Sequence, residues 1–168
     1  NYNARKFGVK SGIPIMLAKN KLKEEDAVFL PADFDYYSDM SSKGMEIIEK
    51  YADVFEYVGR DEAYLDVTKK TEIDFHNAEH LAQQLKNEIR NKLKLTCSVG
   101  ITPNKLLSKI ASDYKKPDGL TTVKPEQVEE FLSPLKIREI PGIGKKTEEV
   151  FTQMNVHTIE AVSYTHLT

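Results

Sequence analysis

Hydrophobic residues recur along the chain with two spacings, one typical of helices and one typical of strands. The strongest helical pattern sets Gln, Lys, Glu and Arg residues opposite a continuous apolar stripe, which consists of Ala78, Leu81, Ala82, Leu85, Ile89 and Leu93. A weaker pattern follows Asp35, with apolar positions at Tyr37, Met40, Ile47, Ile48 and Tyr51. A third places Lys105 and Lys109 outward, and its inward residues are Leu106, Leu107, Ile110 and Ala111.

Short apolar runs between turn-forming residues predict strands. Residues 54–58 and 62–68 are two such runs, and the short link Gly59-Arg60-Asp61 favours an antiparallel hairpin. We expect further strands at residues 95–101 and 120–123, and strands or extended pieces around a basic turn at residues 13–17 and 27–30.

The order helix, strand, strand, helix, strand, helix, strand predicts an α+β fold with helices packed on one face of a sheet. Another helix is expected to begin at Pro125 and to end near Leu132. After Ser133 the pattern changes to short helical pieces, and we place a boundary near residue 134.

Composition narrows the class of protein. The chain has 168 residues, of which 40% are hydrophobic and 30% charged. It can bury a core, but it has no run of the roughly 18 apolar residues that a membrane-spanning helix needs. The single cysteine, Cys97, excludes an internal disulfide framework and a cysteine-based zinc site, and it fits a reducing compartment.

The net charge of −2 argues at first against a nucleic-acid partner, because a basic domain is the usual sign of one. The charges, however, are unevenly distributed. Residues 1–23 carry six basic residues and no acid, whereas residues 24–66 carry 13 acids and three bases. Two solvated faces of opposite sign explain this as well as a binding function does.

Asp61 and Glu62 are adjacent carboxylates at the predicted hairpin turn. Neighbours in a regular strand point to opposite faces, so only a turn or bulge, here with the backbone freedom of Gly59, lets both reach one ion. Magnesium takes carboxylate oxygens together with substrate phosphates, which suits phosphoryl transfer with two metal ions. On spacing alone, an exposed acidic turn is the simpler explanation.

Three further segments favour phosphate binding. Pro141-Gly142-Ile143-Gly144-Lys145-Lys146-Thr147 predicts a tight hairpin before a helix N-terminus, which favours anions without reading bases. An ordinary turn between helices is the alternative there. The second segment is a basic helix end with Lys105, Lys109, Lys115 and Lys116, for which a solvated helix face is the alternative. Pro117 biases Lys116 out of helical conformation. In residues 1–14, the aromatic Tyr2 beside Arg5 could hold a triphosphate.

Together and in this order, these segments resemble the Y-family translesion DNA polymerases of the DinB or DNA polymerase IV type, closest to archaeal members. The matching segments are residues 1–14, 61–66, 98–104 with 116–119, and 140–144. The resemblance implies a ferredoxin-like palm at residues 32–133, with an antiparallel sheet and helices on one face. It also implies part of the fingers at 1–31 and the start of a thumb with a helix-hairpin-helix at 134–162. It also implies a cytoplasmic enzyme of DNA repair.

The same resemblance implies roles for individual residues. Asp61 and Glu62 would be catalytic and hold two magnesium ions, and Gly12 would lie against the nascent base pair. The incoming deoxynucleoside triphosphate would be bound by Tyr2, Arg5 and Lys116. The DNA backbone would be contacted by Gly142, Gly144, Lys145, Lys146, Thr147, Lys105 and Lys109. A sliding clamp is an expected partner, through a C-terminal region absent here.

Three features depart from the family pattern. The N-terminal strand with another metal-binding aspartate is missing, so we expect this fragment alone to be inactive. Gly59-Arg60 replaces the small and apolar pair that is common before Asp-Glu, and the role of Arg60 is undecided. The thumb is incomplete, and one hypothesis is that residues 163–168 are a non-native tail. Two alternatives to the polymerase are a non-catalytic DNA-binding helix-hairpin-helix module and a nucleotidyl cyclase-like enzyme.

Overall fold

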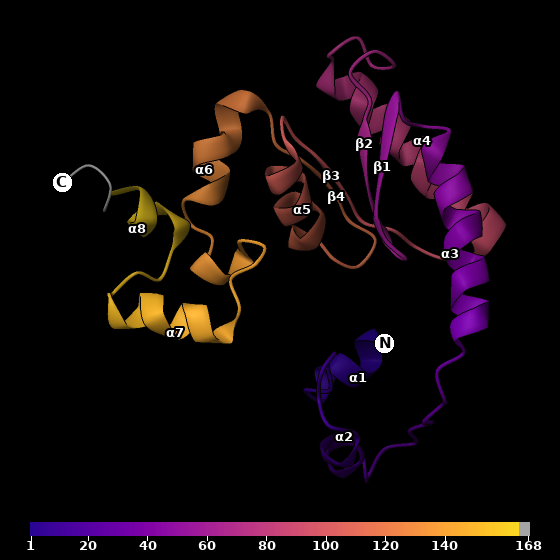
Figure 1. Cartoon of the computed structure of the whole chain (residues 1–168), viewed down its shortest axis with the longest axis vertical. Helices are drawn as coiled ribbons and strands as arrows, with labels where there is room; N and C mark the ends of the chain where they lie inside the picture. The colour runs from indigo at the N-terminus through magenta and orange to yellow at the C-terminus, as the bar shows by residue number, and fades with distance from the viewer. Residues whose placement is uncertain (165–168) are drawn as a thin grey trace. The chain divides into compact units, whose positions relative to one another are not determined.

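The computed structural model describes residues 1–164 (Figure 1). It has two compact units, one from Asn1 to Phe34 and one from Asp35 onward. Helices and strands mix along the second unit, so the predicted α+β class is confirmed. The division into fingers, palm and thumb stays a prediction. Of the tail predicted at 163–168, residues 165–168 lie outside the described residues.

The first unit contains two short helices, α1 (Tyr2–Lys6) and α2 (Ile15–Lys21). The strand or extended piece predicted at residues 13–17 is wrong, because α2 begins directly after Pro14. A run of consecutive apolar residues fits a strand and a helix equally well, so its pattern could not decide between them. Residues 27–30 form no strand within the described part of the chain.

The second unit begins with α3 (Phe34–Glu49), which spans the unit boundary, and with the predicted hairpin. Strands β1 (Val54–Gly59) and β2 (Glu62–Asp66) pair antiparallel. The second strand ends at Asp66 rather than at residue 68. There the Asp66 carboxylate accepts a hydrogen bond from the backbone N–H of Thr68 at 2.9 Å, a local bond that competes with the ladder.

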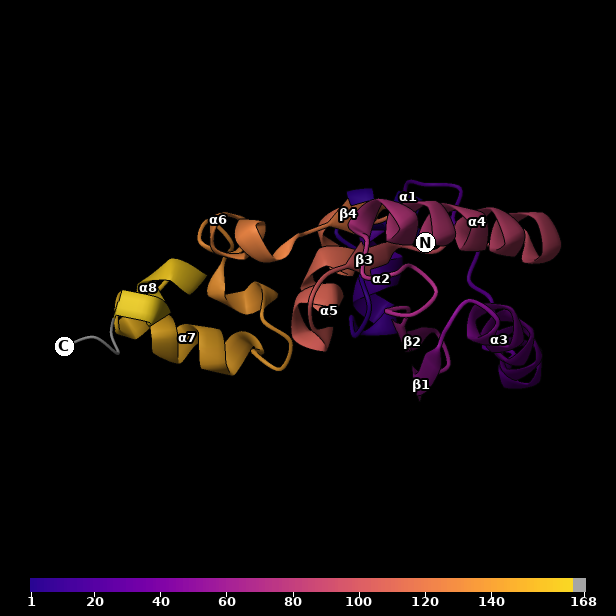
Figure 2. The same ribbon diagram turned by 90° about the horizontal axis from the view of Figure 1, so that it is seen from above.

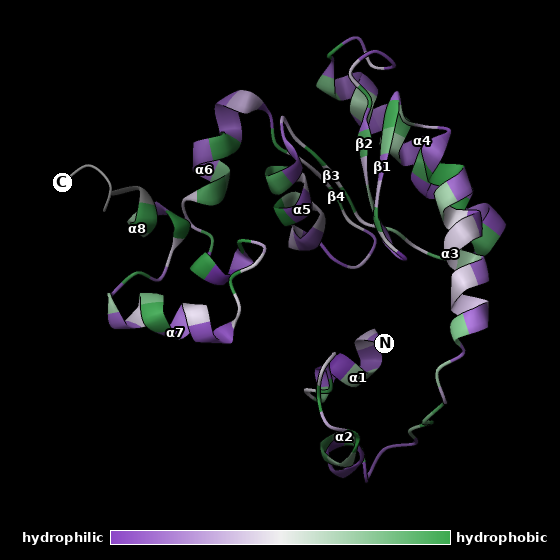
Figure 3. Ribbon diagram, in the orientation of Figure 1, coloured by the Kyte–Doolittle hydropathy of each residue, from purple (hydrophilic) through white to green (hydrophobic). Residues whose placement is uncertain are grey.

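The strongest predicted helix is α4 (Phe75–Leu93), in which apolar and polar residues alternate around the axis (Figure 3). Asp74 caps its start by accepting a hydrogen bond from the N–H of Asn77 at 2.8 Å. Most of the predicted stripe is buried, and Leu85 and Ile89 form a core cluster with Ile47 of α3. Two helices that far apart in the sequence are thus joined through their apolar faces.

A second pair of strands flanks helix α5 (Lys105–Tyr114), which packs against the first of them (Figure 2). These strands, β3 (Val99–Ile101) and β4 (Leu120–Thr122), pair parallel. A helical crossover between two strands returns the chain in the same direction, so this pair departs from the antiparallel pattern expected for the whole sheet. Strand β3 is also shorter than the predicted run 95–101.

Helix α5 buries a narrower stripe than predicted. Leu107, Ile110 and Ala111 are buried, whereas Leu106 is exposed and was wrongly expected to point inward. The three buried residues have i, i+3, i+4 spacing, and Leu106 lies one position outside that stripe.

The C-terminal elements form a small cluster of their own. The predicted helix after Pro125 is present as a 3₁₀ turn, Pro125–Gln127, followed by α6 (Val128–Leu132). Beyond it, Ile137 and Val156 are buried, and the N–H of Ile137 donates to the carbonyl of His157 at 3.0 Å. The helical elements of this part are a 3₁₀ turn at Ile137–Glu139, α7 (Lys145–Gln153) and α8 (Ile159–Tyr164).

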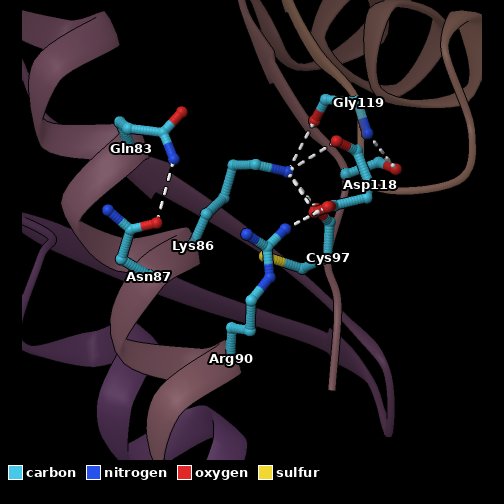
Figure 4. Close-up of polar contacts among 8 residues, drawn as sticks. Gln83, Lys86, Asn87, Arg90, Cys97, Asp118 and Gly119 are labelled. Atoms are coloured by element: carbon cyan, nitrogen blue, oxygen red, sulfur yellow. Dashed lines mark hydrogen bonds and ion pairs between the residues drawn. The ribbon is translucent and has the colours of Figure 1, made fainter. Parts of the chain in front are cut away.

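A buried lysine connects α4 to the loop before β4 (Figure 4). The ammonium of Lys86 donates to the carbonyl of Cys97 at 2.6 Å and to the carboxylate of Asp118 at 2.8 Å. Arg90 binds the other carboxylate oxygen of Asp118. The hydrogen bond from Lys86 and the charges of Lys86 and Arg90 hold the pKa of Asp118 below its ordinary value.

Strand β3 lies unusually close to α5 at Gly100. A Cβ atom on Gly100 would be 2.3 Å from the carbonyl oxygen of Ser108 and 2.7 Å from the amide nitrogen of Ser112. Both atoms belong to the backbone and cannot swing away, so only glycine allows this approach.

We predict that Gly100→Ala lowers the free energy of unfolding by about 1–3 kcal/mol, because the added methyl group forces α5 away from β3. Urea denaturation measures the change. The matched control is Gly59→Ala, where an added Cβ meets no atom within 4 Å. Equal effects of the two substitutions would contradict the close packing described.

A second prediction concerns the pH dependence of stability. A carboxylate whose pKa is lowered by folding stabilises the folded state above its unfolded pKa, and the stabilisation is lost as the pH falls through the folded pKa. Asp118, with an ordinary value of 3.8, is such a group. We expect Asp118→Asn to be less stable at neutral pH and to lose less stability on acidification. Urea denaturation at a series of pH values would refute this if both proteins followed parallel curves.

Candidate functional site

The two predicted catalytic carboxylates lie at the turn of the β1–β2 hairpin. Arg60 and Asp61 form the turn, and Glu62 is the first residue of β2, opposite Gly59. The register shifts between Tyr57 and Gly59, so the expected irregularity at the adjacent carboxylates is present. Gly59 itself has no positive φ, and the turn therefore does not require the backbone freedom predicted for it.

Helix α3 holds this turn from one side. The hydroxyl of Ser41 donates a hydrogen bond to the carbonyl oxygen of Arg60 at 2.5 Å. Arg60 thus takes part in positioning the turn through its backbone. Asp61 is exposed and Glu62 is half-buried, so both carboxylates are accessible to a ligand.

Helix α5 holds the other side through a chain of alternating charges. The ammonium of Lys109 binds the carboxylate of Glu62 and lies 3.3 Å from Asp113. Asp113 in turn accepts a hydrogen bond from Lys116, whose ammonium lies 2.5 Å away. The structure thus brings Glu62 of the predicted acidic turn together with Lys109 and Lys116 of the predicted basic helix end.

The groups in this chain stabilise one another in their charged forms. Partial burial lowers the pKa of Lys109, but the hydrogen bond and charge of Glu62 and the charge of Asp113 outweigh it and raise that pKa. Partial burial likewise raises the pKa of Asp113, but Lys116 and Lys109 outweigh it and lower that pKa. Lys109 and Asp113 are therefore charged at neutral pH.

The donor chemistry of the turn suits magnesium. Magnesium in proteins is commonly held by one or two carboxylates, with substrate phosphates and water completing its shell. Asp61 and Glu62 offer two such carboxylates. Within residues 1–164 no group of three or more His, Cys, Asp or Glu side chains is gathered in one place. A pair of carboxylates fits an ion whose other ligands are substrate phosphates and water.

The predicted triphosphate-binding residues of the first unit are side by side on α1. The guanidinium carbon of Arg5 lies 5.5 Å from the centre of the Tyr2 ring, a cation–π contact. Gly12 has a φ of +79°, so its backbone conformation alone accounts for a glycine there. The placement of these residues against a nucleotide stays a prediction.

The hairpin predicted at residues 141–147 is present. Gly142 has a φ of +92°, and the N–H of Ile143 donates to the carbonyl of Ile140 at 3.1 Å. Gly144 is the N-cap of α7, and Lys145, Lys146 and Thr147 form its exposed first turn. The free amides of that turn and the two lysines would favour an anion.

Lys105 and Lys109, predicted to contact DNA, both make intramolecular ion pairs. Lys105 binds Glu56 and lies over the ring of Tyr64. A DNA phosphate would have to compete with these pairs, and the predicted contact stays untested.

No role was predicted from the sequence for Lys86, Asp113 or Asp118. One signal was available for Lys86, because it lies four residues after Ala82 of the apolar stripe. Asp113 stands four residues after Lys109, a spacing that brings opposite charges together on a helix.

No helix among the described residues is long and apolar enough to cross a membrane.

Comparison with known proteins identifies two family models along the chain. Residues 1–113 match the model of the impB/mucB/samB family, and residues 125–156 match the IMS family HHH motif.

Curated relatives and solved structures agree with this result. DNA polymerase IV of Nitrosopumilus maritimus is 72% identical over 95% of this chain, and that of Methanosarcina acetivorans is 46% identical over 95%. The crystal structure of DinB from Sulfolobus solfataricus covers 94% of this chain with a TM-score of 0.88 and 42% identity. An insertion ternary complex of Dbh DNA polymerase covers 94% of it with the same score and identity.

The chain spans less than half the length of these proteins: 44% and 45% of the two curated relatives, and 46% and 45% of the two solved chains. The family match covers well over half of the chain itself, from its first residue through most of α5. The resemblance to Y-family polymerases is therefore confirmed, and the chain belongs to the impB/mucB/samB family.

Proposed function

We propose that this chain is a segment of a DNA-directed DNA polymerase for lesion bypass, which adds deoxynucleotides to a primer. The observation that supports this best is the charge network from Glu62 through Lys109 and Asp113 to Lys116. It connects Glu62, whose carboxylate can bind a metal ion, to Lys116, whose ammonium can bind a phosphate. Phosphoryl transfer by two-metal chemistry needs these two functions near one another.

Asp61 and Glu62 would hold magnesium, which when bound supplies activation of the primer hydroxyl and neutralisation of phosphate charge. Lys116 and Arg5 would bind the phosphates of the incoming nucleotide and stabilise their charge as it develops during transfer. The hydroxyl of Tyr2 would donate to the same triphosphate. Gly12 would leave room beside the nascent base pair.

Lys109 would have a balancing role in this site. Its ammonium neutralises Glu62 within the protein, so the two neighbouring carboxylates do not repel each other without compensation. Asp113 holds Lys109 and Lys116 in place at the same time. In this proposal α5 presents charges of both signs to the nucleotide.

The α7 hairpin would hold the DNA backbone independently of sequence, through Gly142, Gly144, Lys145, Lys146 and Thr147. Lys105 and Lys109 would add contacts on α5. The whole protein would act in DNA repair in the cytoplasm and would dock on a sliding clamp through a region outside this chain. A DNA-binding module without catalysis, or a cyclase, would give no templated extension.

We predict that Asp61→Asn or Glu62→Gln in the full-length protein reduces primer extension by at least about 10³-fold, since each removes several kcal/mol of charge stabilisation. Extension of a labelled primer with magnesium measures this, and DNA affinity should change little. The control is Glu56→Gln, which removes an exposed carboxylate from the same hairpin. Undiminished extension by both site variants would rule out their catalytic role.

We also predict that the double substitution Lys145→Gln, Lys146→Gln weakens DNA binding equally for unrelated sequences. If both lysines bind phosphates, the slope of log affinity against log salt should fall by about 0.9 for each phosphate that the variant no longer neutralises. The control is Lys69→Gln, Lys70→Gln, two exposed lysines after the hairpin. An unchanged salt slope, or a weakening that depends on sequence, would argue against the proposed role of these lysines.

A further inference from the structure

Lys86 is the most deeply buried charged side chain in the described part of the molecule, with 5% of its surface exposed. Its ammonium lies within hydrogen-bond distance of four oxygen atoms (Figure 4). Besides the carbonyl oxygen of Cys97 and the carboxylate of Asp118, these are the carbonyls of Asp118 at 2.9 Å and Gly119 at 3.1 Å. Three of the four acceptors thus belong to two consecutive residues of one loop.

Stability alone does not explain this arrangement. A buried ammonium is costly unless every proton is bonded, and replacing a buried ion pair by apolar residues is often neutral or stabilising. An ammonium has three protons, and here all three find acceptors, with Asp118 supplying the opposite charge. Such a site restrains the groups it binds, because moving any of them would break a hydrogen bond to the buried ammonium.

The loop that Lys86 holds contains the proposed phosphate-binding lysine. Lys116 is two residues before Asp118, and both lie between α5 and β4. The loop is also tied to β3, since the N–H of Val99 donates to the carbonyl of Gly119 at 3.0 Å. The N–H of Gly119 in turn donates to the hydroxyl of Ser98 at 3.1 Å.

The loop also folds tightly back on the end of α5. A Cβ atom on Gly119 would be 2.4 Å from the carbonyl oxygen of Lys115. The loop therefore turns back so sharply that Gly119 lies against the backbone of a residue only four positions earlier. Lys116 therefore occupies a short loop whose far end is fixed by Lys86. At its near end, the side chain of Lys116 binds Asp113.

We infer that Lys86 is a positioning residue, which holds the loop of Asp118 and Gly119 so that Lys116 is presented to the phosphates of the incoming nucleotide. This inference rests on the proposed polymerase function. Because the ammonium of Lys86 is buried against the loop, Lys86 would act on the nucleotide through Lys116 and not by direct contact. Its removal should weaken nucleotide binding and leave DNA binding unchanged.

The first test is steady-state nucleotide incorporation by the full-length protein. Lys86→Met keeps the length of the side chain and removes its donors. We expect it to raise KM for the incoming nucleotide about tenfold, with kcat within about twofold, as for weakened ground-state binding. The matched control is Lys92→Met on the same helix, where the exposed lysine binds Glu88. Lys86→Arg, which keeps the charge and the donors, should recover part of the affinity.

A double-mutant cycle with Lys116→Ala separates positioning from a general loss of structure. If Lys86 acts through Lys116, Lys86→Met should have little further effect on KM once Lys116 is absent. The same increase in both backgrounds, or no increase in the first, would overturn the inference. Should Lys86→Met fail to fold, Asp118→Asn replaces it in the cycle, because it weakens the same interaction while keeping the shape of the side chain.

Amide hydrogen exchange gives a second readout that does not depend on activity. Amides of residues 115–122 should exchange faster in Lys86→Met than in the wild type, and Lys92→Met should leave them unchanged. Unchanged exchange in Lys86→Met would overturn the inference. A wild-type protein that does not extend a primer would overturn the proposed function, while the exchange result would still decide whether Lys86 holds the loop.

Discussion

The buried ammonium of Lys86 is the interaction on which the second unit most depends. Strands β3 and β4 have only three residues each, so their ladder supplies few backbone hydrogen bonds. Lys86 adds bonds from α4 to the chain on both sides of that ladder, at Cys97 before β3 and at Asp118 and Gly119 before β4. One side chain thus connects the apolar core of α3 and α4 to the loop that contains Lys116.

Helix α5 connects the core of the second unit to the candidate site. Its apolar stripe and the close approach at Gly100 fix its position against β3. The opposite face then presents Lys109 and Asp113 to the hairpin turn and to Lys116. Exposed ion pairs contribute only about 0–1 kcal/mol each, so these charges do not hold the helix in place. The core places α5, and α5 places the charges.

Sequence patterns identified α4 by its long apolar stripe, α3 by a weaker one, and the β1–β2 hairpin by two short runs around a turn. They failed where a run was short, as at α2, or where direction depended on the connection, as for the parallel pair β3 and β4. The carboxylates Asp61 and Glu62 and the hairpin at 141–147 could be located by their motifs. The ion pair of Glu62 with Lys109 and the bonds of Lys86 to Asp118 could not, because they join elements that meet only in the folded chain.

The charge distribution has a different meaning once the ion pairs are known. Several acids of the block 24–66 bind partners within the second unit, as Glu56 does with Lys105 and Glu62 with Lys109, while the Asp53 carboxylate accepts the backbone N–H groups of residues 69 and 70. These pairs reduce the repulsion that an acidic block would exert on DNA, but they also occupy the lysines of α5. A phosphate approaching α5 must displace a carboxylate, whereas Lys145 on α7 is 78% exposed and lies 3.9 Å from its nearest acid. Exposed cations gain more from counterion release than cations already paired. In the proposed function, sequence-independent binding of DNA would therefore come mainly from the α7 hairpin, and α5 would serve mainly the nucleotide.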